Sequence, residues 1–347
     1  MAAIDANVQL AHDPFLGMTE EDEKFYKGLA AKTLVAAATY PITAVKTLIQ
    51  LGHEPFPLSS GKALIVAGRN AYFLPNGFSY AKQLAEKKGV SVLWTGLDSA
   101  LVSFVVGGTV GHVAKKHLDK YYPEVGGSAE FDGKEEKALS DHESFRRMLR
   151  ACIRDSTVRT VAVIVARPMT VVCVRQIAQL IGGEAKYQTV FQGLRLIGIE
   201  EGPGGLFSGL IPHILGELAV VAGVHFATYF AERAIVRSGL YEKANESEQG
   251  KKELDDVRKA VHFIVPFAVN SVTYPYSLVS TVMAVAGSGL AVSFLPYSPA
   301  FPTWMSAWDY LSPHGLKRGS RLFLREQQGA VSVGVDKQLY ATNRHFV

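Results

Sequence analysis

Apolar residues in this chain are gathered into five long segments, separated by stretches that are rich in charge and glycine. The segments run from Gly28 to Leu51, Leu97 to Ala114, Val158 to Ile181, Leu210 to Ala231 and Ala260 to Gly287. A membrane-spanning helix needs about 20 mostly apolar residues, and each segment approaches that length. Buried helices of a large soluble α-helical protein are the alternative, but the lengths and the glycine and proline content favour a membrane bundle.

Two polar stretches, Asp119 to Ser144 and Ser238 to Asp256, lack aliphatic periodicity and are predicted to be solvated loops. They divide the chain into three blocks of a size at which internal repeats are common. We predict a polar N-terminal segment (1–23), a repeat region (24–319) and a polar C-terminal tail (320–347). Within the repeat region the predicted repeats cover residues 24–118, 145–237 and 257–319, the third being truncated.

The three blocks share a proline inside an apolar helix and a glycine-containing turn further on. The prolines are Pro41, Pro168 and Pro275, and the turns hold Gly89 and Gly96 in the first block and Gly202 and Gly209 in the second. The third block keeps only a fragment, from Gly315 to Gly319. Glycine permits positive φ and close approach, so these residues are expected where a short surface helix turns into the next span.

Charge and cysteine usage exclude several classes of function. The net charge of +4 comes from scattered Lys and Arg, so nucleic-acid binding has no electrostatic footprint. Cys152 and Cys173 form neither a disulfide framework nor a metal-ligand pattern. The chain also lacks a nucleophile–base set and a phosphate-binding loop, so we expect no enzyme, metal or cofactor.

The spacing of the repeat resembles the mitochondrial carrier family over roughly Lys24 to Gly319: Pro-x-acid-x-x-base, then acid-Gly-x-x-x-aliphatic-aromatic-x-Gly. The resemblance implies six tilted helices around a central cavity, in three two-helix repeats. In that family the acid and base positions form an ion-pair gate. Here the acid positions are Thr43, Thr170 and Ser277 and the base positions are Lys46, Cys173 and Ser280, so that gate is expected not to form.

No window after Gly319 is long and apolar enough for a sixth span. We therefore predict an all-α membrane protein with a carrier-like three-fold helical repeat that lacks its sixth transmembrane helix. The missing span and the lost gate, together with the Lys46–Gln50 and Tyr274-Pro275 motifs, resemble the mitochondrial carrier homolog family. This resemblance implies a multi-pass protein of the outer mitochondrial membrane. Its partners would be transmembrane helices of client proteins, a pro-apoptotic BH3-class protein and membrane lipids.

A bundle without one helix exposes its polar interior sideways to lipid, which predicts a substrate groove. Its candidate residues are polar groups within apolar spans: Lys46, Arg175, Glu217, Tyr274 and Thr281. The resemblance implies insertion of α-helical, notably tail-anchored, proteins, and such a groove suits an insertase because it offers polar partners part-way into the bilayer. A docking receptor, a lipid scramblase and a small-anion carrier are the alternatives, and the lost gate disfavours the carrier.

Each groove residue also has a structural interpretation. Lys46 could extend its ammonium group to the interface, and Glu217 could pair with His213. Tyr274 could pack beside Pro275, and Arg175 could anchor a lipid headgroup.

Overall fold

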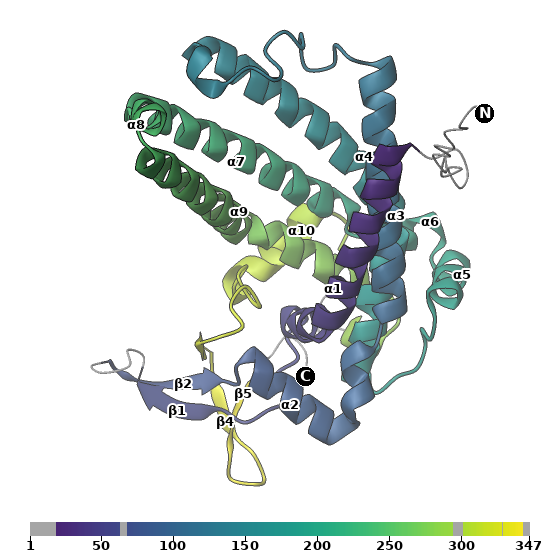
Figure 1. Cartoon of the computed structure of the whole chain (residues 1–347). Coiled ribbons are helices and arrows are strands. Elements are labelled where there is room, and N and C mark those ends of the chain that lie inside the picture. The colour runs from purple at the N-terminus through teal and green to yellow at the C-terminus, as the bar shows by residue number, and fades with distance from the viewer. Residues whose placement is uncertain (1–18, 63–67, 294–300, 328, 343–347) are drawn as a thin grey trace, which may run out of the picture.

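Five long helices form the body of the protein: α1 (Glu20–Gln50), α3 (Leu97–Tyr121), α4 (Asp141–Gly182), α7 (Leu210–Arg237) and α9 (Glu248–Val285) (Figure 1). The computed structural model describes residues 19–62, 68–293, 301–327 and 329–342. Four helical segments are long and apolar enough to cross a membrane: Glu20–Gln50, Val90–Tyr121, Asp141–Gly182 and Gly202–Arg237. The predicted fifth span is helical within α9 but falls outside this set, because His, Asn, Pro and Tyr interrupt its apolar run.

Helix starts follow capping chemistry more than hydropathy. α3 and α7 begin at the predicted residues, each directly after a glycine. α1 and α4 begin well before the predicted spans, because Thr19 with Asp22 and Ser140 with Glu143 form capping boxes at their N-termini. Most of the predicted N-terminal segment, residues 1–18, lies outside the described residues, and its end forms the first turn of α1.

The predicted loop from Ser238 to Asp256 is wrong, because most of it is helical. It contains α8 (Leu240–Glu246) and the first turns of α9, which Ser247 caps through the backbone N–H of Gly250. Leu254 packs with Ile235 and Ala244 in a small apolar cluster. Glu and Lys are good helix formers, so one buried leucine and a cap suffice to fold this polar stretch.

The first long helix of each repeat is followed by short helices that lie at one end of the bundle. These are α2 (Gly77–Lys88) and the 3₁₀ helix η2 (Val90–Trp94) after α1, α5 (Val190–Glu200) and α6 (Gly202–Leu206) after α4, and α10 (Trp304–Leu311) and η5 (Ser312–His314) after α9. Two further 3₁₀ turns are η3 (Glu136–Ala138) and η4 (Ala291–Ser293). The order of long helix and short helix is therefore kept three times.

The prediction of an all-α protein misses five short strands. β1 (Ser59–Lys62), β2 (Asn70–Leu74) and β3 (Arg325–Glu326) form an antiparallel sheet in that order, with Phe73 opposite both Ser59 and Glu326. β4 (Val331–Val333) and β5 (Leu339–Ala341) form a hairpin. The predicted polar tail is thus partly folded, because it pairs with a segment more than 250 residues earlier in the chain.

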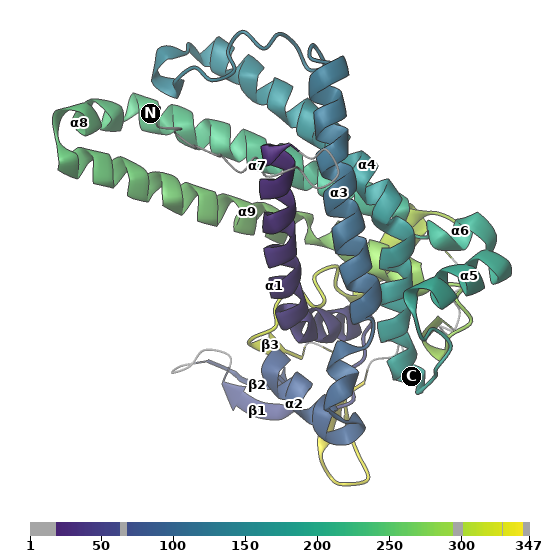
Figure 2. The same ribbon diagram turned by 45° about the vertical axis from the view of Figure 1, so that its right-hand side comes forward.

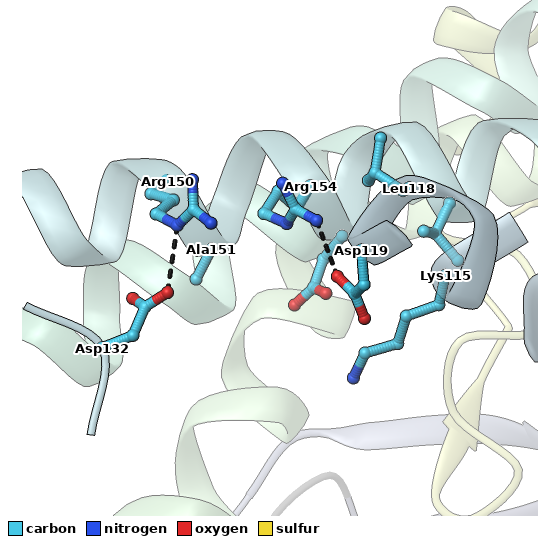
Figure 3. A pocket seen from close by; sticks show the side chains of 9 residues that line it. Lys115, Leu118, Asp119, Asp132, Arg150, Ala151 and Arg154 are labelled. Atoms are coloured by element: carbon cyan, nitrogen blue, oxygen red, sulfur yellow. Dashed lines mark hydrogen bonds and ion pairs between the residues drawn. The ribbon is translucent and has the colours of Figure 1, made fainter. Parts of the chain in front are cut away.

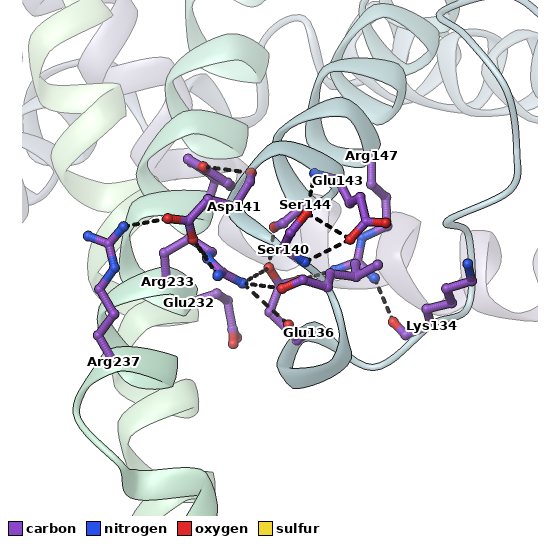
Figure 4. Close-up of polar contacts among 12 residues, drawn as sticks. Lys134, Glu136, Ser140, Asp141, Glu143, Ser144, Arg147, Glu232, Arg233 and Arg237 are labelled. Atoms are coloured by element: carbon purple, nitrogen blue, oxygen red, sulfur yellow. Dashed lines mark hydrogen bonds and ion pairs between the residues drawn. The ribbon is translucent and has the colours of Figure 1, made fainter.

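The two ends of the bundle differ in their packing. We call the end that holds α2, α5, α10 and the sheet the basal end, and the end that holds α8 and residues 122–140 the apical end (Figure 1). Three apolar clusters pack at the basal end, around Leu48, Ile197 and Leu278. At the apical end ion pairs dominate: Arg233 and Arg237 both bind Asp141, and Arg147 binds Glu136 (Figure 4).

Candidate functional site

The residue before the shared proline of each repeat (Pro41, Pro168 and Pro275) bonds to the same place in its own repeat. Tyr40, Arg167 and Tyr274 are all buried. Each donates to the backbone carbonyl just before the second turn of its repeat: Tyr40 Oη to Thr95 at 2.7 Å, Arg167 Nε to Ser208 at 3.0 Å, and Tyr274 Oη to Arg318 at 2.7 Å. The shared bond identifies three structural repeats, although these three side chains are not the same.

A glycine with positive φ follows each accepting carbonyl. Gly96, Gly209 and Gly319 have φ values of 87°, 67° and 77°. A Cβ at Gly209 would lie 2.6 Å from the carbonyl oxygen of Ser280, and one at Gly319 would lie 2.9 Å from Tyr274 Oη, so only glycine fits. Gly89 and Gly202, the other predicted turn glycines, also have positive φ. The positive φ expected at these glycines is confirmed.

The same residues connect each repeat to the next, so that the three repeats close into a ring. Tyr40 Oη lies 3.6 Å from Cys173 Sγ, Arg167 Nη2 donates to the carbonyl oxygen of Ser280 at 3.3 Å, and Lys46 Nζ lies 5.2 Å from the centre of the Tyr274 ring. Cys173, Ser280 and Lys46 are the base positions of the carrier motif. We call these three junctions, with their glycines, the basal ring. Among the described residues, no ion pair joins the acid and base positions.

Lys46, Tyr274 and Thr281, three of the predicted groove residues, meet at the junction of the third repeat with the first. Gln50 connects Tyr274 with Thr281: its Nε2 donates to Tyr274 Oη at 2.9 Å, and its Oε1 accepts from Thr281 Oγ1 at 3.4 Å. Arg318 Nε donates to the Gln50 carbonyl at 2.9 Å. Gln50 and Arg318 were not among the predicted groove residues. Gln50 follows Lys46 by one helical turn, a signal that could have identified it.

Arg175 lies apart from this junction and faces neither lipid nor water. Its side chain is fully buried, with Nε donating to the carbonyl oxygen of Ala284 at 2.8 Å and Nη2 to Glu201 Oε2 at 2.8 Å. Tyr187 Oη lies 3.3 Å from Nη1. Arg175 was predicted to line the groove or to anchor a lipid headgroup, and its burial shows that both predictions are wrong. Instead, Arg175 connects the second repeat to α9.

Glu217 lies on α7, facing α4. Arg159 Nε donates to its Oε2 at 2.7 Å, while His213 Nε2 lies 3.7 Å from its Oε1. The predicted pairing with His213 is present, but Arg159 is the nearer partner. Because the Arg159 side chain is half exposed, this pair is an accessible polar group within a span.

α1 has a helical neighbour along only one side. On that side it packs on α3, where Asp22 binds His112 Nε2 at 2.7 Å and the rings of Phe25 and His112 stack at 3.9 Å between centroids. Within α1, which is described throughout, every buried residue lies at Tyr40 or beyond. Leu34 is 73% exposed. The first twenty residues of α1 therefore present an unpaired face.

α9 likewise has an exposed face on the side toward α1. It packs on α7, where a Cβ at Gly223 would lie 2.7 Å from Val269 Cγ1. Between Asp255 and Thr273 no side chain of α9, itself fully described, is buried, and Phe267 is 75% exposed. Figures 1 and 2 show α1 and α9 meeting at the basal end and separating toward the apical end. We call these two unpaired faces the open edge.

Polar side chains on both helices continue from the basal ring along the open edge. On α1, Thr43 and Thr39 lie three and seven residues before Lys46 and so share its helical face, and both are exposed. On α9, Ser277 and Asn270 lie three and ten residues before Ser280, which places them near its helical face, and both are exposed. We call these four residues the polar track. It places hydroxyl and amide groups beside exposed apolar side chains.

A second polar site is a small cavity near the apical end, between α3 and α4. Its volume is about 180 Å³, and its lining includes Lys115, Asp119, Asp132, Arg150 and Arg154 (Figure 3). Arg150 binds Asp132 at 3.1 Å and Arg154 binds Asp119 at 2.6 Å. Both arginines also donate to backbone carbonyls of residues 122–127. Their charges are thus used to fold that loop. Among the described residues there is no group of His, Cys, Asp or Glu suited to a metal ion.

Three head-to-tail repeats of a proline-kinked helix, a short basal helix and a positive-φ glycine define a carrier-type membrane protein. The family model "Mitochondrial carrier protein" matches residues 23–125 and 147–238. Mouse mitochondrial carrier homolog 1 is 32% identical over 303 residues, covering 84% of this chain and 74% of its own length. Human mitochondrial carrier homolog 2 is 32% identical over 287 residues, covering 82% of this chain and 89% of its own.

The chain therefore belongs to the mitochondrial carrier family, in the branch of the mitochondrial carrier homologs. It is a mitochondrial membrane protein. The third repeat lies outside the ranges that the family model matches, and its place in the family rests on the basal ring, where Tyr274 and Gly319 repeat the roles of Tyr40 and Gly96.

Proposed function

We propose that this protein inserts α-helical, notably tail-anchored, proteins into the outer mitochondrial membrane. The observation that carries the proposal is the open edge, whose polar track runs from the basal ring between two helices that otherwise face lipid. A client helix would enter along the track and leave sideways into the bilayer. No covalent step is needed, since the protein only lowers the barrier to moving polar flanks across hydrocarbon.

We infer that the edge is open because the third repeat supplies one membrane helix where the others supply two. Gly96 and Gly209 are each followed directly by a long helix, α3 or α7. Gly319 is followed by β3 and the β4–β5 hairpin, and the described residues after it, 320–327 and 329–342, contain no helix. α3 packs along α4 and α7 along α9, so the absent helix is the one that would have packed along α1.

The polar track supports insertion because it offsets the cost that limits this reaction. An amide or hydroxyl moved into hydrocarbon without a partner costs about 2 to 7 kcal/mol. The hydroxyls of Thr39 and Thr43 and the amide of Asn270 offer partners along the path. Leu34 and Phe267, both exposed on the same helices, would contact the apolar part of the client.

The basal ring favours an insertase over a small-anion carrier. Alternating access needs a latch that opens and closes, and charged pairs supply one in carriers. Here the junctions are a contact of Tyr40 with Cys173, a hydrogen bond from Arg167 to the Ser280 carbonyl, and a contact of Lys46 with the Tyr274 ring, and none of the three is an ion pair. Lys46 is the only base position with a charge, and it forms no ion pair with the described residues.

Insertion can be tested in liposomes that contain the purified protein and receive a tail-anchored client from a soluble chaperone. Protection of a C-terminal tag from protease measures the insertion rate. We expect the protein to accelerate insertion over empty liposomes, and the triple variant Thr43→Val, Asn270→Leu, Ser277→Ala to lose most of that acceleration. Thr157→Val is the matched control, because Thr157 is an exposed threonine on α4 away from the track. Equal rates with empty liposomes would refute the proposal.

The same liposomes separate the alternative functions. Headgroup quenching of a labelled lipid on both leaflets would reveal a scramblase, for which a polar track open to lipid is also suited. Client binding without protease protection would indicate a docking receptor for an amphipathic segment such as a BH3-class helix. Uptake of a small anion would indicate a carrier.

A further inference from the structure

The C-terminal residues after Gly319 cross from the third repeat to the first. We call residues 320–327 and 329–342 the strap. Gly77 N donates to the carbonyl oxygen of Leu322 at 2.7 Å, and Leu58 N donates to that of Leu339 at 2.7 Å. β3 of the strap extends the β1–β2 sheet. All these partners belong to residues 54–78, which follow α1 in the first repeat.

A buried ion pair fixes the strap where it passes under the end of α1. Arg325 binds Glu54, and their side chains are 6% and 5% exposed. Arg325 Nη1 also donates to the carbonyl oxygen of Pro75 at 2.9 Å, and Arg318 stabilises the Glu54 carboxylate electrostatically. Removing one partner of such a pair leaves an unpaired buried charge. Separation of the strap from the first repeat at this point is therefore unfavourable.

The position of the strap in the repeat gives it a mechanical role. Two of the three connections between repeats are reinforced by long helices, with α3 packed along α4 and α7 along α9. Gly107 and Gly111 on α3 lie against Ala166 and Ala162, and Gly223 on α7 lies against Val269. No such helix among the described residues reinforces the connection from the third repeat to the first. This connection consists of the Gln50–Tyr274–Arg318 contacts and the strap.

We propose that the strap is a clasp that holds α1 and α9 together at the basal end and thereby sets the width of the open edge. Glu54 and Arg325 are the positioning residues of this clasp. The clasp rests on the proposed function, because it would control how far the client pathway opens. Its geometry can be measured without any client, so it can be tested independently of insertion.

Distances across the open edge give the direct test. Leu34→Cys and Phe267→Cys place spin labels on exposed positions of α1 and α9, with Cys152 replaced by alanine and Cys173 by serine, which keeps a polar partner for Tyr40 Oη. Pulsed electron–electron double resonance on the protein in lipid nanodiscs then measures the distance between the two spin labels. We expect Arg325→Gln and Glu54→Gln to broaden the distance distribution and lengthen its mean. An unchanged distribution in both variants would overturn the proposal.

Arg69→Ala is the matched control, since it removes the exposed ion pair of Arg69 with Glu326, the neighbour of Arg325 in the strap, at 2.7 Å. This variant should leave the distribution unchanged. A change as large as that of Arg325→Gln would overturn the assignment to the buried pair.

A reversible lock keeps the test valid even if Arg325→Gln folds poorly. Leu58→Cys with Leu339→Cys joins the strap to the first repeat at a backbone hydrogen bond. In the Arg325→Gln background the disulfide should restore the narrow distribution, and its reduction, after thioether-linked labels are attached, should broaden it again. No difference between the oxidised and reduced forms would refute the clasp. If the distances respond while insertion rates do not, the clasp stands and its link to insertion fails.

Discussion

At the residue scale, buried charge in this protein serves to join repeats. Arg175 is the clearest case, because each nitrogen of its guanidinium group has a hydrogen-bond partner outside α4 and its side chain is fully buried. Replacing one partner of a buried pair typically costs about 3 to 5 kcal/mol, and Glu201, with a fifth of its side chain exposed, recovers part of that through water.

Arg175→Met is therefore expected to lower the free energy of unfolding by about 2 to 4 kcal/mol. Denaturant titration in detergent micelles, followed by circular dichroism, measures the change. Lys27→Ala is the control, since Lys27 and Glu23 form an exposed pair within one helix and such pairs contribute less than about 1 kcal/mol. A cost for Arg175→Met no larger than that of the control would contradict the structural role.

His53 gives the basal end a dependence on pH. Burial, with the nearby Lys88 and Lys87, lowers the pKa of His53 to about 4 from its ordinary value of 6.5. Between these values the unfolded chain binds a proton that the folded chain excludes, so the free energy of unfolding falls as the pH drops from 6.5 toward 4. Above pH 6.5 both states are neutral at this position and the contribution is constant.

His53→Asn removes this titration. We expect the variant to have a shallower decline of stability than the parent protein between pH 6.5 and 4, in parallel denaturation series. The basal contacts made by the His53 backbone, such as its carbonyl bond with Tyr80 Oη at 2.8 Å, are kept. An identical slope in the two proteins would show that His53 does not titrate in this way.

At the element scale, glycine lets neighbouring spans approach each other. Gly223 on α7 faces Val269 on α9, and a Cβ there would lie 2.7 Å from a methyl group of that valine. Small residues at helix contacts are the main device by which membrane helices pack closely. Between Asp255 and Thr273 no side chain of α9 is buried, so the position of this stretch depends heavily on the contact with α7.

Gly223→Ala should push α7 and α9 apart and destabilise the protein by about 1 to 3 kcal/mol, the usual cost of overpacking. Gly198→Ala in α5 is the matched control, because a Cβ there meets nothing within 4 Å and alanine favours helix. Thermal unfolding in detergent measures both. Equal stability of the two variants would contradict the close contact between α7 and α9.

The elements divide into those with a local signal and those without one. The helices around Pro41, Pro168 and Pro275 and the turns at Gly96 and Gly209 were predictable, because apolar runs and glycines are read from neighbouring residues. The strands were not, since β3 pairs with a segment over 250 residues away and has only two residues. The burial of Arg175 was equally hidden, because Glu201 and Ala284 reach it only through the tertiary fold.

At the scale of the whole molecule, two polar ends enclose one apolar bundle. α4 has 42 residues and, at about 1.5 Å each, spans about 63 Å, roughly twice the thickness of a hydrocarbon core. Its apical part binds residues 122–136 and the end of α7 through Arg150, Arg154 and Asp141. The loop after α3 and the turn after α7 therefore lie at one end of the bundle, and α2 with the sheet lies at the other.

Single cysteines test this topology in the membrane. Lys82→Cys on α2, Lys134→Cys in the loop after α3 and Lys243→Cys in α8 introduce thiols at the two polar ends. A membrane-impermeant maleimide is applied to intact mitochondria, with detergent-opened mitochondria as the reference. Lys134→Cys and Lys243→Cys should give the same result, either both labelled or both protected in intact mitochondria, and Lys82→Cys should give the other result. The buried Cys152 and Cys173 should stay unlabelled. Labelling of all three positions from one side would place the basal ring and the apical loops on the same face, which membrane-crossing helices α3, α4 and α7 do not allow.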